Sequence, residues 1–182
     1  MNRIIIFFLV FIFQIGLFAQ SKTPIIGYDI VAWGSSVDVV KKHYSDIIES
    51  KSFGEIFIDQ RYFTQSDVNT GGINTREFHF FKNKLYKVEV KYYDPAYIIP
   101  KFSDTGLSFS EAEILYNKLV SIYGKFDFDL QSPGSSYYSW RYNQYLTISY
   151  RVTVGKNDKY RVDIIYENPV VKEQIKNSKM QL

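Results

Sequence analysis

The chain has 182 residues, of which 46% are hydrophobic and 18% aromatic, so it can bury the core of a single domain. Its formal net charge is only +3, and its charged residues are interspersed, without the basic stripe that nucleic-acid binding requires. It contains no cysteine, which excludes disulfide bonds and lipid attachment through an N-terminal cysteine.

The first twenty residues have the pattern of a secretory signal peptide. Arg3 supplies a positive charge, residues 4–19 are almost entirely apolar, and polar sequence follows. We expect cleavage after Ala19 or Gln20, which leaves residues 21–182 as one domain in the periplasm or outside the cell. The alternative is a retained membrane anchor, but 16 residues are fewer than the roughly 20 that a spanning helix needs. No second long apolar segment follows, so we expect no stable membrane span after cleavage.

The first half of the domain is expected to contain one helix and several strands. Ser35 and Asp38 form a loose capping box at the helix start, and apolar residues then recur at spacings of three and four. In the last strand Lys87, Glu89 and Lys91 alternate with apolar residues, which predicts one solvated sheet face. The expected elements are a strand at 25–31, a helix at 36–45, a strand at 55–63, a loop at 65–75, and a hairpin of 76–81 and 85–93.

The second half is expected to begin with the most regular helix of the chain. Two capping boxes overlap at its start, Ser108 with Glu111 and Ser110 with Glu113, and Gly124 is placed to end it. A hairpin turning at Asn143-Gln144 follows, with faultless alternation of apolar and polar residues in its second strand. The expected elements are a helix at 110–123, strands at 137–142, 145–154 and 160–167, and a terminal helix at 170–177.

The two hairpins indicate an internal repeat. Residues 78–92 align with residues 138–152 without a gap, and a capped helix precedes each hairpin, so the units would cover about 33–93 and 108–167. The alternative is that any two amphipathic hairpins align this well. Helices that alternate with antiparallel hairpins favour an α+β fold. We expect a two-layer sandwich in which two helices lie on one face of an antiparallel sheet.

Two segments carry a resemblance to small periplasmic modules of bacteria. Residues 34–40 (Gly-Ser-Ser-Val-Asp-Val-Val) resemble the glycine-led entry to the first helix of that group, and Leu85-Tyr86 follows the hairpin turn. The tandem helix-and-hairpin pattern over about 33–167 is similar to the β-lactamase inhibitory proteins and to the small lipoprotein of the outer-membrane β-barrel assembly machine. The resemblance implies a protein that binds other proteins, and it transfers no functional residue.

Residues that could carry catalysis are few and scattered. His43 and His79 belong to different elements without metal-ligand spacing, and we expect His79 on the solvent side of its strand. No nucleophile elbow supports a Ser–His–Asp triad. Asp127 and Asp129 could form a carboxylate pair, although a solvated strand edge explains them better. The sequence therefore predicts no enzyme activity and no catalytic, cofactor-binding or metal-binding residue.

Aromatic side chains crowd into residues 137–145, which is the unusual feature of this composition. In an alternating strand three of them share one face and Tyr137 takes the other. Tyrosine and tryptophan are favoured at binding surfaces, and the alternative is ordinary core and cross-strand packing. The candidate binding surface consists of Tyr137, Tyr138, Trp140, Tyr142 and Tyr145.

These observations predict an exported, non-enzymatic binding module of the periplasm or cell envelope. We expect its partner to be another envelope protein, bound through the sheet face or an exposed edge strand. One alternative is a small-molecule carrier with an aromatic-lined pocket between sheet and helices. A further alternative is a hydrolase, which would require a deep pocket containing His43 or Asp127.

Overall fold

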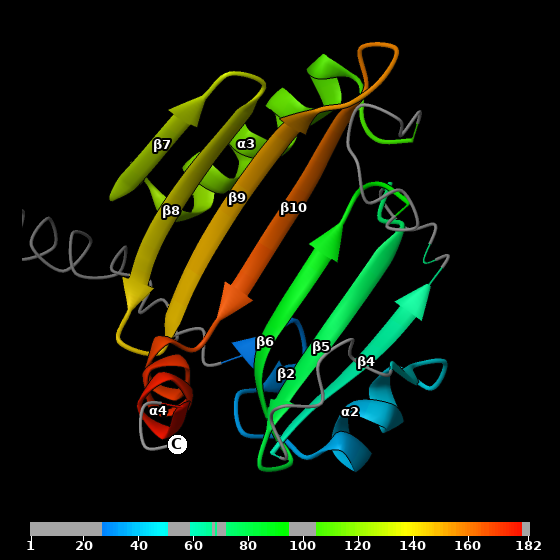
Figure 1. Ribbon diagram of the computed structural model, residues 1–182, viewed down its shortest axis with the longest axis vertical. Helices are drawn as coiled ribbons and strands as arrows, with labels where there is room; N and C mark the ends of the chain where they lie inside the picture. Colours follow the sequence, from blue (N-terminus) through cyan, green and yellow to red (C-terminus); the bar gives the residue numbers. More distant parts are fainter. Residues whose placement is uncertain (1–26, 51–58, 67, 69–71, 95–104, 180–182) are drawn as a thin grey trace, which may run out of the picture.

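The computed structural model describes residues 27–50, 59–66, 68, 72–94 and 105–179 of the chain. The expected signal peptide and its cleavage site lie outside these residues. The described part is an α+β fold, as the sequence predicts, with an eight-stranded antiparallel sheet, a two-stranded sheet and three helices (Figure 1).

The main sheet has the strand order β3-β4-β5-β6-β10-β9-β8-β7, and every neighbouring pair is antiparallel. The strands are, in chain order, β3 (Ile48–Ser50), β4 (Gln60–Ser66), β5 (Thr75–Phe81), β6 (Lys84–Lys91), β7 (Phe128–Ser132), β8 (Ser135–Asn143), β9 (Leu146–Val154) and β10 (Tyr160–Glu167).

This strand order shows that the fold consists of two equivalent halves. Helix α2 (Val37–His43) precedes β3 to β6, and helix α3 (Phe109–Tyr123) precedes β7 to β10. Each set of strands is a meander, and the last strands of the two sets, β6 and β10, pair at the centre of the sheet. Each unit thus has a helix and four strands, where the sequence indicated a helix and a hairpin. Position in the sheet matches β5–β6 with β9–β10, so the alignment of residues 78–92 with 138–152 is displaced by one strand.

The N-terminal segment differs from the single strand expected at 25–31. β1 (Gly27–Tyr28) and β2 (Val31–Ala32) form a small hairpin, because Asp29 adopts a φ of 51° and reverses the chain. Helix α2 is shorter than the predicted 36–45. Its N-cap is Ser36, whose Oγ accepts a 3.4 Å hydrogen bond from the Val39 N–H.

The hairpin of β5 and β6 turns where the sequence predicts. Lys82 and Asn83 have φ values of 49° and 59°, which is the left-handed pair that a two-residue hairpin turn of this type requires. The strand expected at 55–63 is displaced, since β4 begins at Gln60 and continues to Ser66 into the expected loop. Residues 51–58 lie outside the described part.

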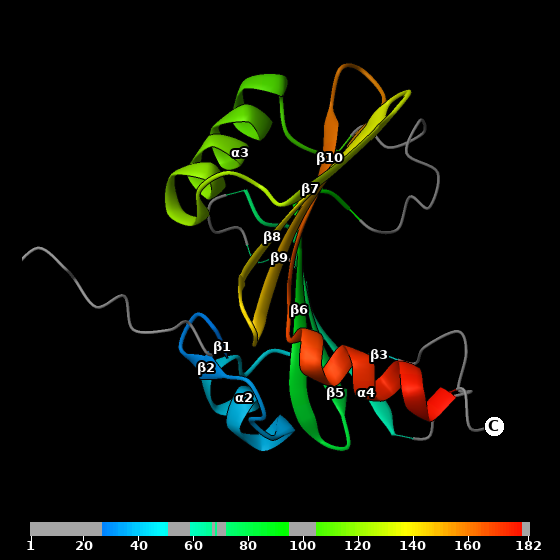
Figure 2. The ribbon, with the colours of Figure 1, turned by 90° about the vertical axis from the view of Figure 1, so that its left-hand side faces the viewer.

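The helices cover the two faces of the sheet unequally. α2 and α3 lie on one face, as predicted, and α4 (Pro169–Lys179) lies on the other (Figure 2). We call the first the helix face and the second the open face. α4 covers only one end of the open face, where Ile175 is buried.

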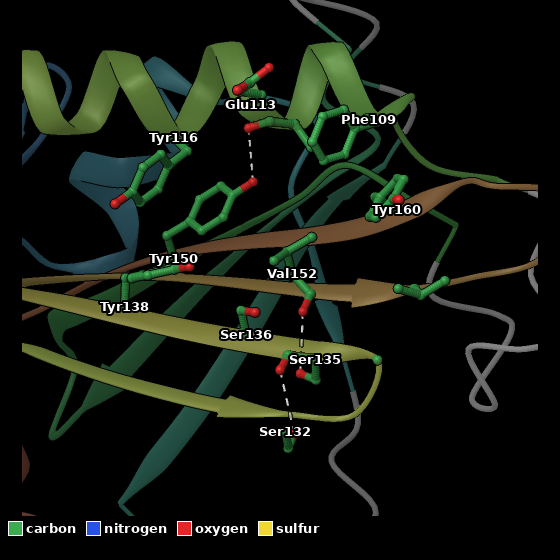
Figure 3. Close-up of a pocket in the computed structure, with 13 residues that line it drawn as sticks. Phe109, Glu113, Tyr116, Ser132, Ser135, Ser136, Tyr138, Tyr150, Val152 and Tyr160 are labelled. Carbon is green, nitrogen blue, oxygen red and sulfur yellow. Dashed lines mark hydrogen bonds between the residues drawn. The ribbon is translucent and has the colours of Figure 1, made fainter.

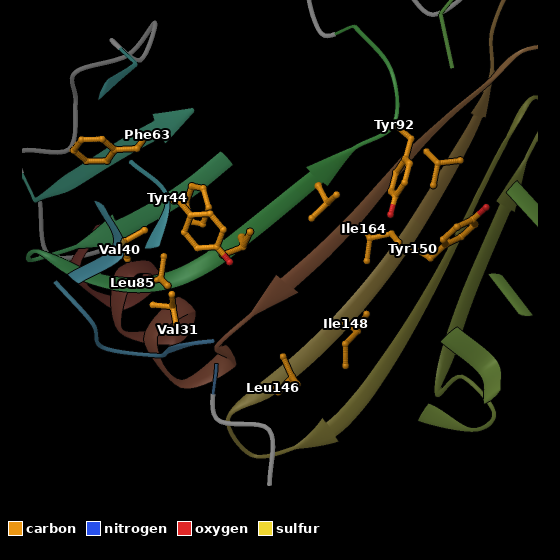
Figure 4. Packing of buried hydrophobic residues seen from close by; sticks show 14 of the residues in the cluster. Val31, Val40, Tyr44, Phe63, Leu85, Tyr92, Leu146, Ile148, Tyr150 and Ile164 are labelled. Atoms are coloured by element: carbon orange, nitrogen blue, oxygen red, sulfur yellow. The ribbon is translucent and has the colours of Figure 1, made fainter. Parts of the chain in front are cut away.

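The hydrophobic core lies under the helix face and is shared by both halves (Figure 4). Leu119 of α3 and Ile148 of β9 belong to the same buried cluster. Each fully buried side chain contributes roughly 1.5–3 kcal/mol before conformational entropy is subtracted. The largest fully buried side chains are Trp140, Phe63, Phe78, Phe80, Leu85, Leu146 and Ile148.

Candidate functional site

A cleft of about 400 Å³ opens on the helix face between α3 and the strands β8, β9 and β10 (Figure 3). Five of the thirteen residues that line it are aromatic, and its lower rim is formed by the turn between β7 and β8. The side chains that shape it include Phe109, Tyr116, Tyr138, Tyr150, Val152 and Tyr160.

The start of α3 is fixed over β10 by a backbone bridge. Leu107 N–H donates to the Tyr160 carbonyl at 3.0 Å, and Tyr160 N–H donates to the Leu107 carbonyl at 2.8 Å. Gly106 permits this approach, because a Cβ at that position would lie 2.6 Å from the Tyr160 oxygen and its φ is +134°. As a result the Phe109 and Tyr160 rings meet at one end of the cleft, 5.7 Å apart.

The opposite end of the cleft is formed by tyrosines in contact with one another. Tyr116 lies 4.9 Å from the Tyr138 ring and 5.9 Å from the Tyr150 ring. Tyr150 is held upright because its hydroxyl donates a 2.9 Å hydrogen bond to the Ala112 carbonyl. Ala112 also lines the cleft, and its small side chain leaves space beside these rings. A larger side chain at position 112 would fill that space.

Burial determines the protonation state of the tyrosines around the cleft. It raises the pKa of Tyr150, with the neighbouring hydroxyls of Tyr138, Tyr92 and Tyr116 as smaller causes. Burial also raises the pKa of Tyr116. These phenols stay protonated at neutral pH, so they offer neutral rings and hydroxyl donors to a ligand.

The polar side chains of the cleft are few. Among the described lining residues Glu113 is the only charged one, and it is exposed at the rim. Serines complete the rim, and Ser135 Oγ donates a 3.2 Å hydrogen bond to the Val152 carbonyl. The arrangement can bind an apolar, flat molecule, and it supplies no base and nucleophile in contact.

Three of the five aromatic residues singled out from the sequence lie on the helix face, and Tyr138 is the one that lines the cleft. Trp140 is 1% exposed and donates a 2.9 Å hydrogen bond from Nε1 to the Gly124 carbonyl, so it belongs to the core. Tyr142 packs on Tyr123 of α3, with ring centroids 5.5 Å apart.

The other two lie elsewhere. Tyr137 is on the open face, where its hydroxyl is 2.7 Å from Ser149 Oγ and its ring is 6.2 Å from Phe128. Tyr145 lies in the turn between β8 and β9 and is 44% exposed. The five residues therefore form no continuous surface.

Sequence reasoning missed the residues that α3 and β10 contribute to the cleft. Phe109, Ala112, Glu113 and Tyr116 recur at the three- and four-residue spacing of one helix face. The sequence predicted a helix at 110–123 but assigned none of these four residues to the candidate binding surface. The pairing with Tyr160 required knowledge of the bridge at Leu107.

A polar region, separate from the cleft, lies on the open face across β5, β6, β9 and β10. His79 is on the side of β5 opposite Phe78 and Phe80, as expected, but it is only 8% exposed rather than solvated. The rings of Tyr62 and Tyr86 pack against it at centroid distances of 4.7 and 6.4 Å. Burial is the largest cause of its lowered pKa.

The remaining candidates from the sequence lie apart from the cleft. His43 is exposed at the end of α2. Asp127 accepts a 2.6 Å hydrogen bond from the Arg141 N–H, which fixes the approach to β7, and Asp129 is an exposed residue of β7. None of the three lines the cleft.

Comparisons with protein-family models, curated proteins and solved structures found no match for this chain. Within the described residues, no helix combines the length and the apolar character needed to cross a bilayer. The class that the fold defines is an α+β protein with an eight-stranded antiparallel main sheet and a cleft with aromatic walls between that sheet and α3.

Proposed function

We propose that this chain is an exported, non-enzymatic binding module that holds a small organic ligand in the cleft between α3 and β8–β10. The cleft carries the proposal, because about 400 Å³ is within the usual size of small-molecule sites and its walls are aromatic. The N-terminal pattern of a charged residue and an apolar run supports export. Of the sequence interpretations, the geometry favours the small-molecule carrier over the protein-binding module.

The lining residues indicate the chemistry of the ligand. Tyr116, Tyr138 and Phe109 offer ring faces and edges, which favour flat apolar groups. Glu113 is negative, and the lining described above contains no lysine or arginine, so an anionic ligand would gain no ion pair there. Ring faces also attract cations. We therefore infer a neutral or cationic amphipathic ligand.

Fluorescent dyes of different charge test this inference with the purified chain. We expect the neutral dye Nile red and the cationic dye thioflavin T to bind, and the anionic dye 1-anilinonaphthalene-8-sulfonate to bind at least about tenfold more weakly. Ser136→Phe places a ring in the cleft and should weaken thioflavin T binding by at least about tenfold, measured by fluorescence titration.

The matched control is Ser139→Phe, on the same strand but facing the open side of the sheet. It should leave dye binding within about twofold of the unmodified chain. Equal effects of the two substitutions, with both variants folded by circular dichroism, would place the dye outside the cleft and contradict the proposal. Native mass spectrometry of chain purified from the cell envelope would then identify the natural ligand.

The edge strand β7 supports a second candidate function, binding of another protein by strand addition. All five of its residues are exposed, with Phe128 at 55% and Leu130 at 60%. Asp129 is its only charged residue, so it lacks the lysine or proline that usually protects an edge. A partner strand could pair with its outer side.

Crosslinking in intact envelopes distinguishes this second candidate. Leu130→Lys introduces a charge on the edge and should remove a crosslinked protein partner without loss of thermal stability, because the side chain is exposed. Ile48→Lys, at the opposite edge and 74% exposed, is the matched control and should retain the partner. A partner unaffected by Leu130→Lys would exclude β7 as the binding edge.

A further inference from the structure

Charged side chains form a cross-strand cluster on the open face, away from the cleft. Lys91 Nζ lies 2.5 Å from Glu77 Oε1, and Lys87 Nζ lies 2.9 Å from Glu89 Oε2. Arg151 adds contacts of 3.7 Å to Glu89 and 3.1 Å to an adjacent aspartate, Asp163. We call these six residues the ionic cluster; its carboxylates are 8–25% exposed at their side chains.

His79 adjoins the ionic cluster, but its Nε2 atom forms no hydrogen bond with the cluster. The residue is 8% exposed, and its Nε2 atom is buried without a hydrogen-bond partner. Glu77 Oε2 lies 3.6 Å from His79 Nε2, which exceeds hydrogen-bond length. A buried, unpaired nitrogen costs about 1–3 kcal/mol, so its presence calls for an explanation.

We propose that Glu77, His79 and Glu89 bind a divalent transition-metal ion of the zinc type. One ligand atom from each lies within 4.8 Å of those of the other two. Zinc binds such atoms at roughly 2.0–2.2 Å, which requires them to be about 3.5 Å apart, so the ligands need only a small inward movement. The imidazole nitrogen favours zinc, cobalt or nickel over calcium or magnesium.

A small cavity gives the ion a route to the site. It has a volume of about 270 Å³ and is lined by Ser50, Tyr62, Thr64, Glu77 and His79. Water in this cavity could complete the coordination sphere, since three protein ligands leave a fourth position open. The site lies on the opposite face of the sheet from the proposed ligand cleft and does not depend on it.

The lysines make a specific prediction about this site. Lys91 and Lys87 each engage one oxygen of a ligating carboxylate, so a metal ion must compete with two ammonium groups. Removing one of these competitors, the Lys91 ammonium group that engages Glu77, should therefore tighten metal binding. If the ionic cluster is only a structural network, the chain binds no metal ion, and removing the lysine lowers the free energy of unfolding.

Titration of the full chain, purified without a histidine tag, tests the proposal with Co²⁺ absorption and Zn²⁺ calorimetry. We expect one saturable site with visible Co²⁺ bands. His79→Gln should weaken Zn²⁺ binding at least about tenfold. His43→Gln, which changes the only other histidine, should leave it within about twofold. No saturable Zn²⁺ site in the unmodified chain, or equal loss in both variants, would overturn the proposal.

Two further variants guard against misfolding as an explanation. Lys91→Met should tighten Zn²⁺ binding by about tenfold, a gain that an unfolded variant cannot show. Glu89→Gln retains size and shape and should weaken Zn²⁺ binding as His79→Gln does. Unchanged affinity in both, with native circular dichroism, would contradict the assignment of these ligands.

Discussion

At the scale of single residues, protonation on the open face is decided by opposing effects. Burial alone would raise the pKa of Glu77, but the adjacent His79 and Lys91 side chains outweigh it and lower the pKa to about 2. The unfolded carboxyl group has a pKa of 4.5. Glu77 therefore stabilises the fold above pH 4.5, and this contribution is lost as the pH falls toward 2.

Acid unfolding measures this contribution. We expect the free energy of unfolding to fall by about 2 kcal/mol more between pH 5 and pH 2.5 in the unmodified chain than in Glu77→Gln. Asp163 acts in the opposite direction, because burial raises its pKa. Both the unmodified chain and Glu77→Gln contain Asp163, so the difference between their unfolding free energies reports on Glu77. Parallel pH profiles in urea titrations would show that Glu77 has no such role.

At the scale of elements, α3 is fixed at its start by a capping box. Ser108 Oγ accepts from the Glu111 N–H at 3.4 Å, and Glu111 Oε2 accepts from the Ser108 N–H at 2.8 Å. The structure thus selects one of the two overlapping boxes that the sequence offers. Since α3 forms one wall of the cleft, this cap also positions Phe109 and Tyr116.

Alanine substitutions should distinguish the capping role of Ser108 from that of Ser110. Ser108→Ala should lower the free energy of unfolding by about 1 kcal/mol, because it removes the acceptor for the first turn. Ser110→Ala, inside the helix and exposed, should change it by less than about 0.5 kcal/mol. Urea unfolding followed by circular dichroism measures both, and equal losses would place the cap elsewhere.

Elements with regular local patterns could be predicted, and those defined by their neighbours could not. α3 and the β8–β9 hairpin were predicted because helical spacing, caps and strict alternation are properties of adjacent residues. β7 was absent from the predicted elements although residues 126–131 alternate between apolar and polar side chains, and only a solvated strand edge around Asp127 and Asp129 was expected there.

The candidate sites follow the same rule. Tyr138 was predicted as a binding residue from local crowding, whereas Phe109 and Tyr160 meet only because Leu107 bridges to β10. His79 was placed on the correct side of its strand, but its burial depends on rings from β4 and β6. Alternation specifies the face of a side chain, and only tertiary packing specifies its exposure.

At the scale of the whole molecule, the two halves are joined where β10 inserts between β6 and β9. β10 pairs with β6 from Asp163 to Glu167 and with β9 along its full length. The first meander has only local connections, so it can form early. The contact between β6 and β10 spans residues far apart in the sequence and must form late, because it closes a long loop.

β10 is also the last strand in chain order, which has a consequence for biosynthesis. Until residues 160–167 have been synthesised and, if the chain is exported, have crossed the membrane, β6 and β9 each present an unsatisfied edge bearing apolar side chains such as Val88 and Ile148. A chain stopped before β10 would therefore be prone to self-association, and premature termination would yield aggregates rather than a stable half-protein.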